Sequence, residues 1–391
     1  MKKNAIIIGI KNWDFGFPYS VSFDFRNEFR AKGIEVLEPG QYVNRDFYET
    51  VSENYNILFT LTMNQTFESS NYPWRGKFIT WQQDNAFRTT GRFVSNYSDQ
   101  HWLCADGDGV AHAKLWLNAS NPTYHLPHWA TKLDGEVRGP NDHGRSFDLR
   151  PHDILFVGNV NEDEHRRLSN ALNSLKEPYR TFANKVAQRL RDDNTVSLTR
   201  IALETEVEMG NEFSETSFGE FQQILSLLDA QFRIEKRIQC FDALRDIPIT
   251  VVSNDLKTIE NHSSEKITSF SNNDFATGLY MMRNAKLLIN HLPNYQAGAT
   301  ERLFNAQFRG AAVLSEQNEF LNNQFIDRED IFLFNSNDPV NLRDCVLEIK
   351  DSPATLRRVA AAGQAKTTAL HTASQRVAKI VELHAPELSL M

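Results

Sequence analysis

The chain has 391 residues, 41% of them hydrophobic and 24% charged, and a formal net charge of −8. This is an ordinary globular composition, and the length predicts two domains of roughly 150 to 230 residues. The excess of acidic residues excludes an extended nucleic-acid-binding surface, because the neutralisation of phosphates requires clustered lysine and arginine. We therefore expect no nucleic-acid partner.

The cysteines and the apolar runs indicate a cytoplasmic protein. The three cysteines are far apart and match no C-x-x-C spacing, which favours buried thiols in a reducing compartment. The apolar run 5–10 ends at Lys11, too early for a signal peptide, and predicts a first strand instead. No stretch approaches the roughly 20 apolar residues of a spanning helix. Any membrane contact is therefore expected to be peripheral, at the inner face.

The first third of the chain reads as a parallel α/β domain, because short apolar runs alternate with amphipathic helices. The expected strands cover residues 5–10, 33–37, 56–61, 77–81, 102–105 and 124–126. Helices are expected at 22–32 and within 46–54. A polar stretch rich in glycine and proline follows, so we assign residues 1–135 to the first domain and 136–152 to a linker.

The rest of the chain predicts a second domain, 153–375, with a long insertion. Its first strand is expected at 153–157, but the next apolar run begins only at about residue 249. The helix-rich insertion, about 161–247, includes a predicted amphipathic helix over 218–244. The remaining strands are expected at 249–253, 286–289, 311–314 and 331–334, and one final helix at 354–381.

The segment 298–315 has the pattern of an anion-binding helix start. Gly298 leaves the backbone uncluttered, Thr300 is placed to cap a helix, and Arg302 falls in its first turn. Gly310 then suits the end of the helix, before a short apolar strand. Because the N-terminus of a helix presents free N–H groups and partial positive charge, this pattern favours a phosphate or diphosphate ligand.

The motif G-x-x-x-R-x-F-N-x-x-x-x-G, formed by Gly298, Arg302, Phe304, Asn305 and Gly310, resembles the C-terminal domain of GT-B glycosyltransferases. It resembles in particular the CgeB-like branch of the family 1/family 4-type enzymes. The resemblance extends over about a hundred residues. It implies two Rossmann-like domains, a nucleotide-sugar donor in the second, and a glycan or lipid-linked glycan acceptor in the first. It also implies that residues 376–391 pack back on the first domain, and that the setting is bacterial surface polysaccharide synthesis.

The resemblance also implies a set of donor contacts. They are Gly158, Asn159, His291, Gly298, Thr300, Glu301, Arg302 and Asn305. Arg302 would neutralise the departing phosphate, since catalysis of sugar transfer needs charge stabilisation at the leaving group. The alternative for Arg302 is a surface ion pair with Glu301 or Asp274. Asn305 replaces the glutamate by which the family contacts the ribose, so the nucleotide is left open.

Four residues are candidates for the catalytic group. Asp84 and His128 follow expected strands of the first domain and are candidate bases. Alternatively Asp84 caps a helix and His128 is only hydrogen-bonded. Asp229 and Glu162 are candidate nucleophiles for a retaining enzyme, although an ion pair of Asp229 with the residue four positions later would also explain it.

The remaining alternatives concern a possible metal site and the functional class of the protein. Asp106-Gly-Asp108 has D-x-D spacing, but its glycines favour a loop, and we expect no metal and no cofactor other than the donor. One rival is a retaining transferase of a CMP-activated ulosonic acid such as Kdo. The other is a non-catalytic carbohydrate-binding protein of the same fold.

Overall fold

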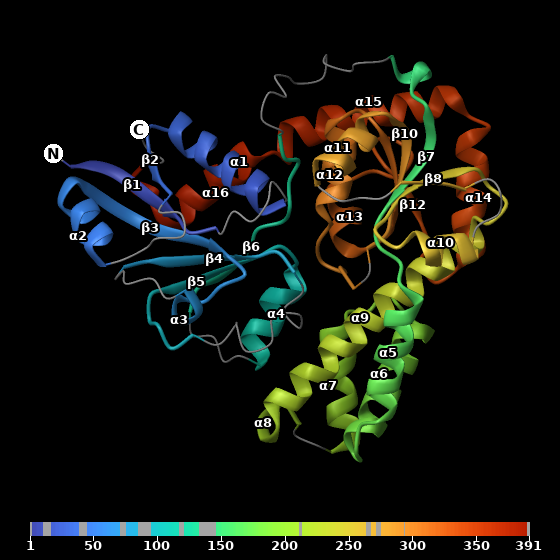
Figure 1. The fold of residues 1–391 in the computed structure, drawn as a ribbon, viewed down its shortest axis with the longest axis horizontal. Helices are drawn as coiled ribbons and strands as arrows, with labels where there is room; N and C mark the ends of the chain where they lie inside the picture. The colour runs from blue at the N-terminus through green and yellow to red at the C-terminus, as the bar shows by residue number, and fades with distance from the viewer. Residues whose placement is uncertain are drawn as a thin grey trace. The chain divides into compact units, whose positions relative to one another are not determined.

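The computed structural model contains two compact units (Figure 1). It describes residues 2–10, 17–38, 45–70, 76–84, 95–116, 121–132, 146–210, 213–262, 267–270, 275–292 and 294–388. The first unit comprises residues 1–137, 274–276 and 369–391, and the second comprises residues 138–273 and 277–368. Most of the expected linker, 136–152, lies outside the described residues.

The first unit is built on a six-stranded sheet whose pairings are all parallel. Its strand order is β2-β1-β3-β4-β5-β6. The strands are β1 (Lys3–Ile8), β2 (Glu35–Leu37), β3 (Tyr55–Met63), β4 (Phe78–Gln82), β5 (Gln100–Cys104) and β6 (Thr123–His125). The helices are α1 (Phe17–Ala31), α2 (Arg45–Asn54), α3 (Phe67–Ser70), α4 (Gly107–Trp116) and α16 (Ala373–His384). Every expected strand of this unit is present, and buried apolar residues mark the central strands β1, β3, β4 and β5, whereas the edge strand β6 is only half-buried.

The end of the chain folds onto this first sheet, and here one expectation is wrong. Instead of one helix over 354–381, two helices form, α15 (Pro353–Leu370) and α16. They separate because Thr372 begins α16 with a capping box, its N–H donating to Gln375 Oε1 at 3.0 Å. Val377 and Ile380 then join the core beneath α1, and Figure 1 shows α1 and α16 side by side.

The second unit has a parallel sheet ordered β12-β11-β10-β7-β8-β9. Its strands are β7 (His152–Val157), β8 (Ile249–Val252), β9 (Ile267–Phe270), β10 (Ala285–Asn290), β11 (Ala312–Glu316) and β12 (Phe332–Phe334). The edge strand β9 was not expected, because its residues alternate between half-buried and exposed and form no apolar run. Numbered within this unit, the order is 3-2-1-4-5-6, that of a dinucleotide-binding sheet, with its switch point between β7 and β10.

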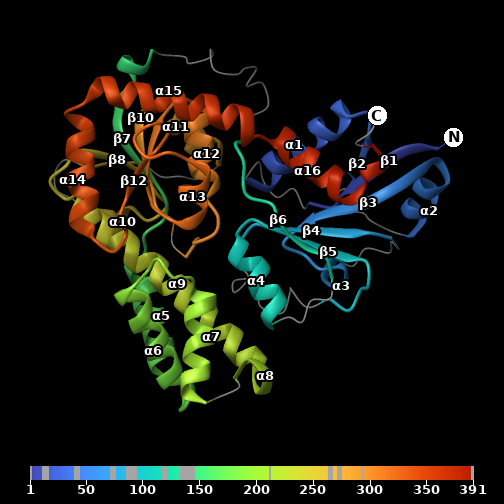
Figure 2. The same cartoon turned by 180° about the vertical axis from the view of Figure 1, so that it is seen from behind.

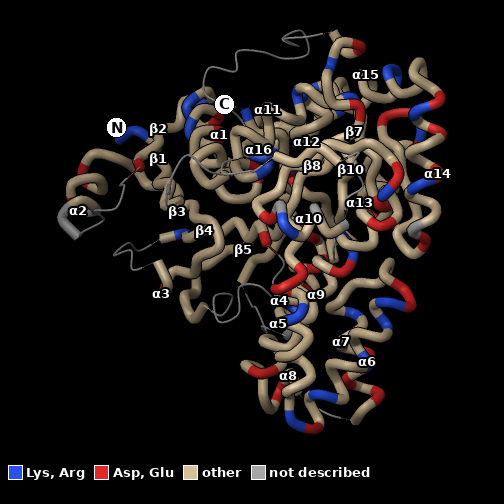
Figure 3. The backbone as a smooth tube through the Cα atoms, turned by 45° about the vertical axis from the view of Figure 1, so that its right-hand side comes forward, with Lys and Arg blue, Asp and Glu red and all other residues tan. Residues whose placement is uncertain are grey.

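A helical bundle is inserted between β7 and β8, and Figure 2 shows it extending away from the sheet. It consists of α5 (Glu162–Asn173), α6 (Tyr179–Asp192), α7 (Leu198–Met209), α8 (Phe213–Thr216) and α9 (Phe218–Ala243). Phe182 is fully buried at its centre, with its ring 5.3 Å from that of Phe213 and 5.8 Å from that of Phe221. Acidic and basic residues mix along α6 and α7 (Figure 3), in pairs such as Arg200 with Glu204.

The remaining helices cover the second sheet. They are α10 (Leu256–His262), α11 (Phe275–Arg283), α12 (Glu301–Phe308), α13 (Glu319–Gln324), α14 (Pro339–Lys350) and α15. Within the described part of the chain, no helix is both long enough and apolar enough to cross a membrane.

Candidate functional site

The switch point of the second sheet brings two strand ends together. In a doubly wound sheet the crevice outside the carboxyl ends of the strands at this point is where ligands bind. β7 ends at Val157 and is followed by Gly158, and the neighbouring β10 ends at Asn290 and is followed by His291. Four of the expected donor contacts, Gly158, Asn159, His291 and Arg302, lie at this point, and a fifth, Thr300, contacts Asn290.

Two arginines converge on the turn after β7. Arg302 Nη1 donates to Val157 O at 2.9 Å, and Arg237 Nη1 donates to Asn159 O at 2.6 Å. A Cβ atom on Gly158 would lie 3.2 Å from Arg302 Nη1 and 3.6 Å from Arg237 Cζ, so the missing side chain lets both guanidinium groups approach. Two positive charges at the end of a strand are suited to a phosphate or diphosphate group.

The alternative of a tight surface ion pair for Arg302 is weak here. Its Nε lies 4.0 Å from Glu301 Oε1, at the limit of an ion pair, while 15% of the side chain is exposed. Asp274, the other expected partner, lies outside the described residues.

The start of α12 is tied to the strand ends. Thr300 occupies the N-cap position, but its side chain makes no cap hydrogen bond. The hydroxyl instead donates to Asn290 Oδ1 at 2.8 Å, while Asn290 Nδ2 donates to Ser315 Oγ at 3.0 Å. Gly298 O accepts from Asn318 Nδ2 at 2.8 Å, which fixes the loop before the helix. Thr300 is therefore at the expected N-cap position, but its hydroxyl holds α12 against β10 instead of bonding to the first turn of the helix.

Asn305 lies inside the unit. Its side chain has no exposed surface, and Oδ1 accepts a hydrogen bond from Arg309 Nη1 at 3.1 Å. The ribose contact implied by the family resemblance remains a prediction.

A buried acid and a buried histidine face each other beside the arginines. His291 Nδ1 lies 2.8 Å from Glu316 Oε1, and the backbone N–H of Leu292 donates to Glu316 Oε2, also at 2.8 Å. Burial lowers the pKa of His291, and the charges of Arg237 and Arg302 lower it further. The pKa of Glu316 is lowered despite burial, because His291 and the Leu292 N–H stabilise the carboxylate.

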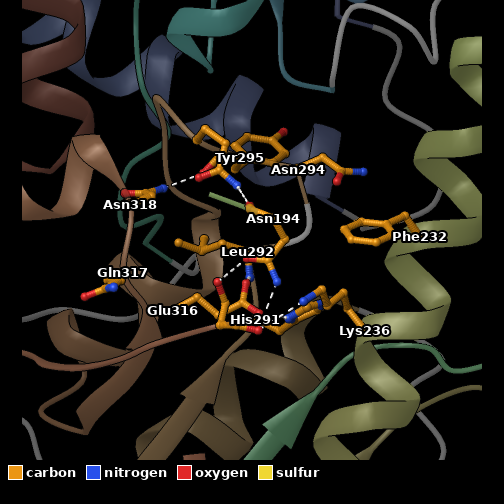
Figure 4. Close-up of a pocket in the computed structure, with 12 residues that line it drawn as sticks. Asn194, Phe232, Lys236, His291, Leu292, Asn294, Tyr295, Glu316, Gln317 and Asn318 are labelled. Carbon is orange, nitrogen blue, oxygen red and sulfur yellow. Dashed lines mark hydrogen bonds and ion pairs between the residues drawn. The ribbon is translucent and has the colours of Figure 1, made fainter. Parts of the chain in front are cut away.

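One cavity is lined by this pair, and a second cavity adjoins the first. A cavity of about 10 Å³, shown in Figure 4, is lined by His291, Glu316 and ten other residues. A larger cavity of about 470 Å³ shares Gln317 and Asn318 with it. The larger cavity has only polar lining residues, namely Thr195, Gln317, Asn318, Glu319, Asn322 and Asn323. Amide and hydroxyl side chains in that number suit a ligand with many hydroxyl groups.

The two candidate nucleophiles have different surroundings. Asp229 is fully buried on α9, ion-paired with Arg233 and accepting from Asn294 Nδ2 at 2.7 Å. It therefore anchors the loop after β10, and it is not among the residues that line either cavity. Glu162 begins α5, where its backbone N–H donates to Thr258 Oγ1 at 3.3 Å.

The two candidate bases lie at the carboxyl edge of the first sheet. Asp84 follows β4, and its Oδ2 accepts from Asn64 Nδ2 at 3.2 Å. His128 is buried, with Nε2 3.2 Å from Gln83 O and its ring 5.1 Å from that of Trp81. The structure thus brings Asp84 and His128 to the same part of this sheet edge. The D-x-D segment is not the expected loop, because α4 begins at Gly107, where Asp106 Oδ1 accepts from the backbone N–H of Asp108.

Sequence reasoning missed three charged residues of the site, namely Lys236, Arg237 and Glu316. The two basic residues lie on α9, the helix predicted over 218–244, on which the sequence indicates only Asp229 as a site candidate. A signal for Glu316 exists in the sequence, because a carboxylate directly follows the apolar run 311–314. Such a residue at the end of a buried parallel strand reaches the ligand-binding edge.

Known proteins are similar to this chain in part of its sequence and in its fold. A family model described as glycosyl transferase-like matches residues 238–382. This part of the chain is therefore similar to a glycosyl transferase-like domain. A comparison with curated proteins finds no match.

Solved structures share the fold over the whole chain. A sucrose-phosphate synthase from Thermosynechococcus elongatus matches with a TM-score of 0.57 and 11% identity, covering 100% of each chain. A glycosyltransferase from Rickettsia africae matches with a TM-score of 0.54 and 10% identity, again covering 100% of each chain. The Anabaena protein HepE in complex with UDP-glucose matches with a TM-score of 0.50 and 8% identity over 100% of each chain. The expected GT-B fold class, with two parallel α/β units, is confirmed.

Proposed function

We propose that the protein transfers a sugar from a nucleotide-activated donor to a glycan or other glycoconjugate acceptor. The convergence of Arg237 and Arg302 on the turn after β7 supports this most directly. The two guanidinium groups would neutralise the phosphate that departs as the glycosidic bond forms. The solved neighbour with UDP-glucose makes a UDP-sugar the first donor to test.

The finer setting follows from the sequence motif. The G-x-x-x-R-x-F-N-x-x-x-x-G pattern supports placement in the CgeB-like branch, and with it a role in bacterial surface polysaccharide synthesis in the cytoplasm. The acceptor would be a glycan or a lipid-linked glycan. Asp84 and His128 are the proposed bases, and Asp229, being ion-paired and fully buried, is proposed as a loop anchor and not a nucleophile.

The test compares arginine variants. Arg302→Ala and Arg237→Ala should each lower transfer or donor hydrolysis on the order of 10²-fold, because each removes charge at the leaving group. Arg200→Ala, on the exposed face of α7, is the matched control and should leave the rate unchanged. Melting curves should be similar for all three variants. Unchanged rates for Arg302→Ala and Arg237→Ala would remove the proposed leaving-group site.

Nucleotide binding tests the donor class. Thermal shifts with UDP, GDP, TDP, ADP and CMP identify the base, since a nucleotide at 100 times its Kd should stabilise the protein by about 2.7 kcal/mol. A shift with CMP alone would favour the ulosonic-acid transferase. Binding of a free glycan without any nucleotide would favour the carbohydrate-binding protein.

A further inference from the structure

One nitrogen of the buried histidine at the switch point lacks a partner. His291 is 1% exposed, and its Nδ1 faces Glu316. Its Nε2 makes no hydrogen bond to any described residue. A buried polar atom left unpaired costs roughly 1–3 kcal/mol, so such an atom beside a ligand crevice calls for a ligand group or a water molecule.

The surroundings of Glu316 fix which proton the imidazole carries. Both carboxylate oxygens accept hydrogen bonds, Oε2 from the N–H of Leu292 and Oε1 from His291. Glu316 is held ionised because its pKa is lowered, and a carboxylate can only accept. The imidazole proton is therefore on Nδ1. A neutral His291 then presents the lone pair of Nε2, which is a hydrogen-bond acceptor.

The cavity at this pair has room for one small group. Its volume of about 10 Å³ is close to that needed by one water molecule, or by one hydroxyl group of a ligand. Three donors of its wall already have protein acceptors. Lys236 Nζ donates to Ser336 O at 3.0 Å, Asn194 Nδ2 to the same oxygen at 2.9 Å, and Asn318 Nδ2 to Gly298 O. Figure 4 shows these side chains around the histidine.

The inserted bundle contributes to this wall. Asn194, in the loop between α6 and α7, is 5% exposed, and its backbone N–H donates to Asn337 Oδ1 at 3.0 Å. Its O accepts from Gln296 Nε2 at 2.5 Å. The loop is therefore fixed against the edge of the second sheet, and no described residue donates to His291 Nε2, so a hydroxyl group of a ligand is a suitable donor.

We propose that His291 Nε2 accepts a hydrogen bond from a hydroxyl group of the bound nucleotide sugar, and that Glu316 is a positioning residue that keeps this nitrogen an acceptor. The inference rests on the proposed function and deepens it. Arg237 and Arg302 would bind the phosphates, because the lone pair of His291 Nε2 repels a phosphate oxygen. The hydroxyl belongs either to the ribose or to the transferred sugar, which share this chemistry.

The first experiment measures binding to the wild-type protein by calorimetry. The probes are UDP and UDP-glucose, with their monodeoxy and monodeoxyfluoro analogues in the ribose or in the glucose. Removing the hydroxyl that meets His291 should weaken binding on the order of 10- to 100-fold, and fluorine in its place should not restore it, because fluorine cannot donate. A loss confined to ribose analogues assigns the ribose, and a loss confined to glucose analogues assigns the sugar.

The second experiment changes the tautomer. In Glu316→Gln, the amide NH₂ can donate to Nδ1, which would move the imidazole proton to Nε2. The ¹⁵N shifts of His291 should report this change, and the fluorinated analogue should then bind nearly as well as the parent. Glu348→Gln, at an exposed position on α14 that lines neither cavity, is the matched control and should keep the wild-type pattern.

Several outcomes would overturn the inference. A wild-type ¹⁵N spectrum that places the imidazole proton on Nε2 would contradict the inference. Equal binding of every analogue would also contradict it, provided that UDP binding still depends on Arg302. In both cases the proposed transferase function stands. If no nucleotide binds at all, the proposed function and this inference fall together. The wild-type measurements need no variant, so they decide the matter even if Glu316→Gln fails to fold.

Discussion

At the scale of single residues, Gly158 keeps the two arginines of the candidate site close to the strand end. An added Cβ would lie 3.2 Å from both Arg302 Nη1 and Phe156 Cε1, so one of them must shift. Arg302 is the longer and more exposed side chain, and it should move first. The chemistry of the site therefore depends on a residue with no side chain.

We expect Gly158→Ala to weaken UDP binding on the order of 10-fold or more with little loss of stability, because the displaced guanidinium no longer meets the phosphate. Gly219→Ala on α9 is the control, since a Cβ there meets nothing within 4 Å. Calorimetric titration and melting curves measure both effects. Equal affinities of the two variants would mean that Arg302 is not positioned by this turn.

Substitution of Asp229 distinguishes a structural role, anchoring the loop after β10, from a catalytic role as a nucleophile. Asp229→Asn loses the ion pair with Arg233 and should lower the free energy of unfolding by about 1–3 kcal/mol. Incubation of the wild-type protein with UDP-glucose, without acceptor, should show no glycosyl adduct by intact mass spectrometry. An adduct mapped to Asp229 or Glu162 would instead establish a covalent intermediate and favour the retaining mechanism.

At the scale of elements, α16 is held by a buried cation and a buried histidine. Arg376 donates to Pro127 O and His128 O, each at 2.9 Å, and to Leu370 O at the end of α15 at 3.2 Å. His384 ends α16, 3% exposed, with its ring 5.0 Å from that of His101. Burial, with the nearby charges of His101 and Lys77, lowers the pKa of His384 to about 3.

This depressed pKa predicts acid sensitivity of the first unit. Between about pH 6.5 and pH 3 the unfolded chain binds a proton at His384 that the folded chain does not, so the free energy of unfolding falls as pH falls. The expected contribution is about 1.4 kcal/mol per pH unit. Urea titrations across this range should show a shallower pH dependence for His384→Phe than for the wild type. Identical pH dependence would show that His384 is protonated equally in both states.

The sequence predicted most elements because buried parallel strands are continuous apolar runs. It failed at β9, an edge strand without such a run, and at the break between α15 and α16. That break has a local sequence signal, because Thr372 and Gln375 have the spacing of a capping box, but the apolar periodicity from which the helix was predicted does not record it. A backbone hydrogen bond from Ala130 N–H to His371 O at 2.9 Å also holds the chain at this point, and no local pattern records that contact.

At the scale of the whole molecule, α16, near the end of the chain, completes the hydrophobic core of the first unit. Ile380 is fully buried in the core of the first unit, although the second unit precedes it in sequence. Val346 on α14 is fully buried in the core of the second unit. Ile380 and Val346 are only 34 positions apart in sequence, but each is buried in the core of a different unit.

These positions provide matched variants. Ile380→Ala and Val346→Ala should each destabilise the protein, by about 2–5 kcal/mol for Ile380 and less for the smaller valine, because both leave cavities. Scanning calorimetry should show that each variant lowers a different unfolding transition. If both variants lower one shared transition equally, the two units unfold as a single cooperative body.

The sequence by itself determined the α/β class, the long insertion and a motif around Arg302 that resembles those of glycosyltransferases. These are local properties, set by apolar periodicity, by helix signals and by residue types at short spacing. Only the tertiary structure decided that α9 of the insertion brings Lys236 and Arg237 to the switch point, and that Glu316 meets His291. Those residues lie on different elements, and the parallel order of the strands brings them to one edge, which no local pattern records.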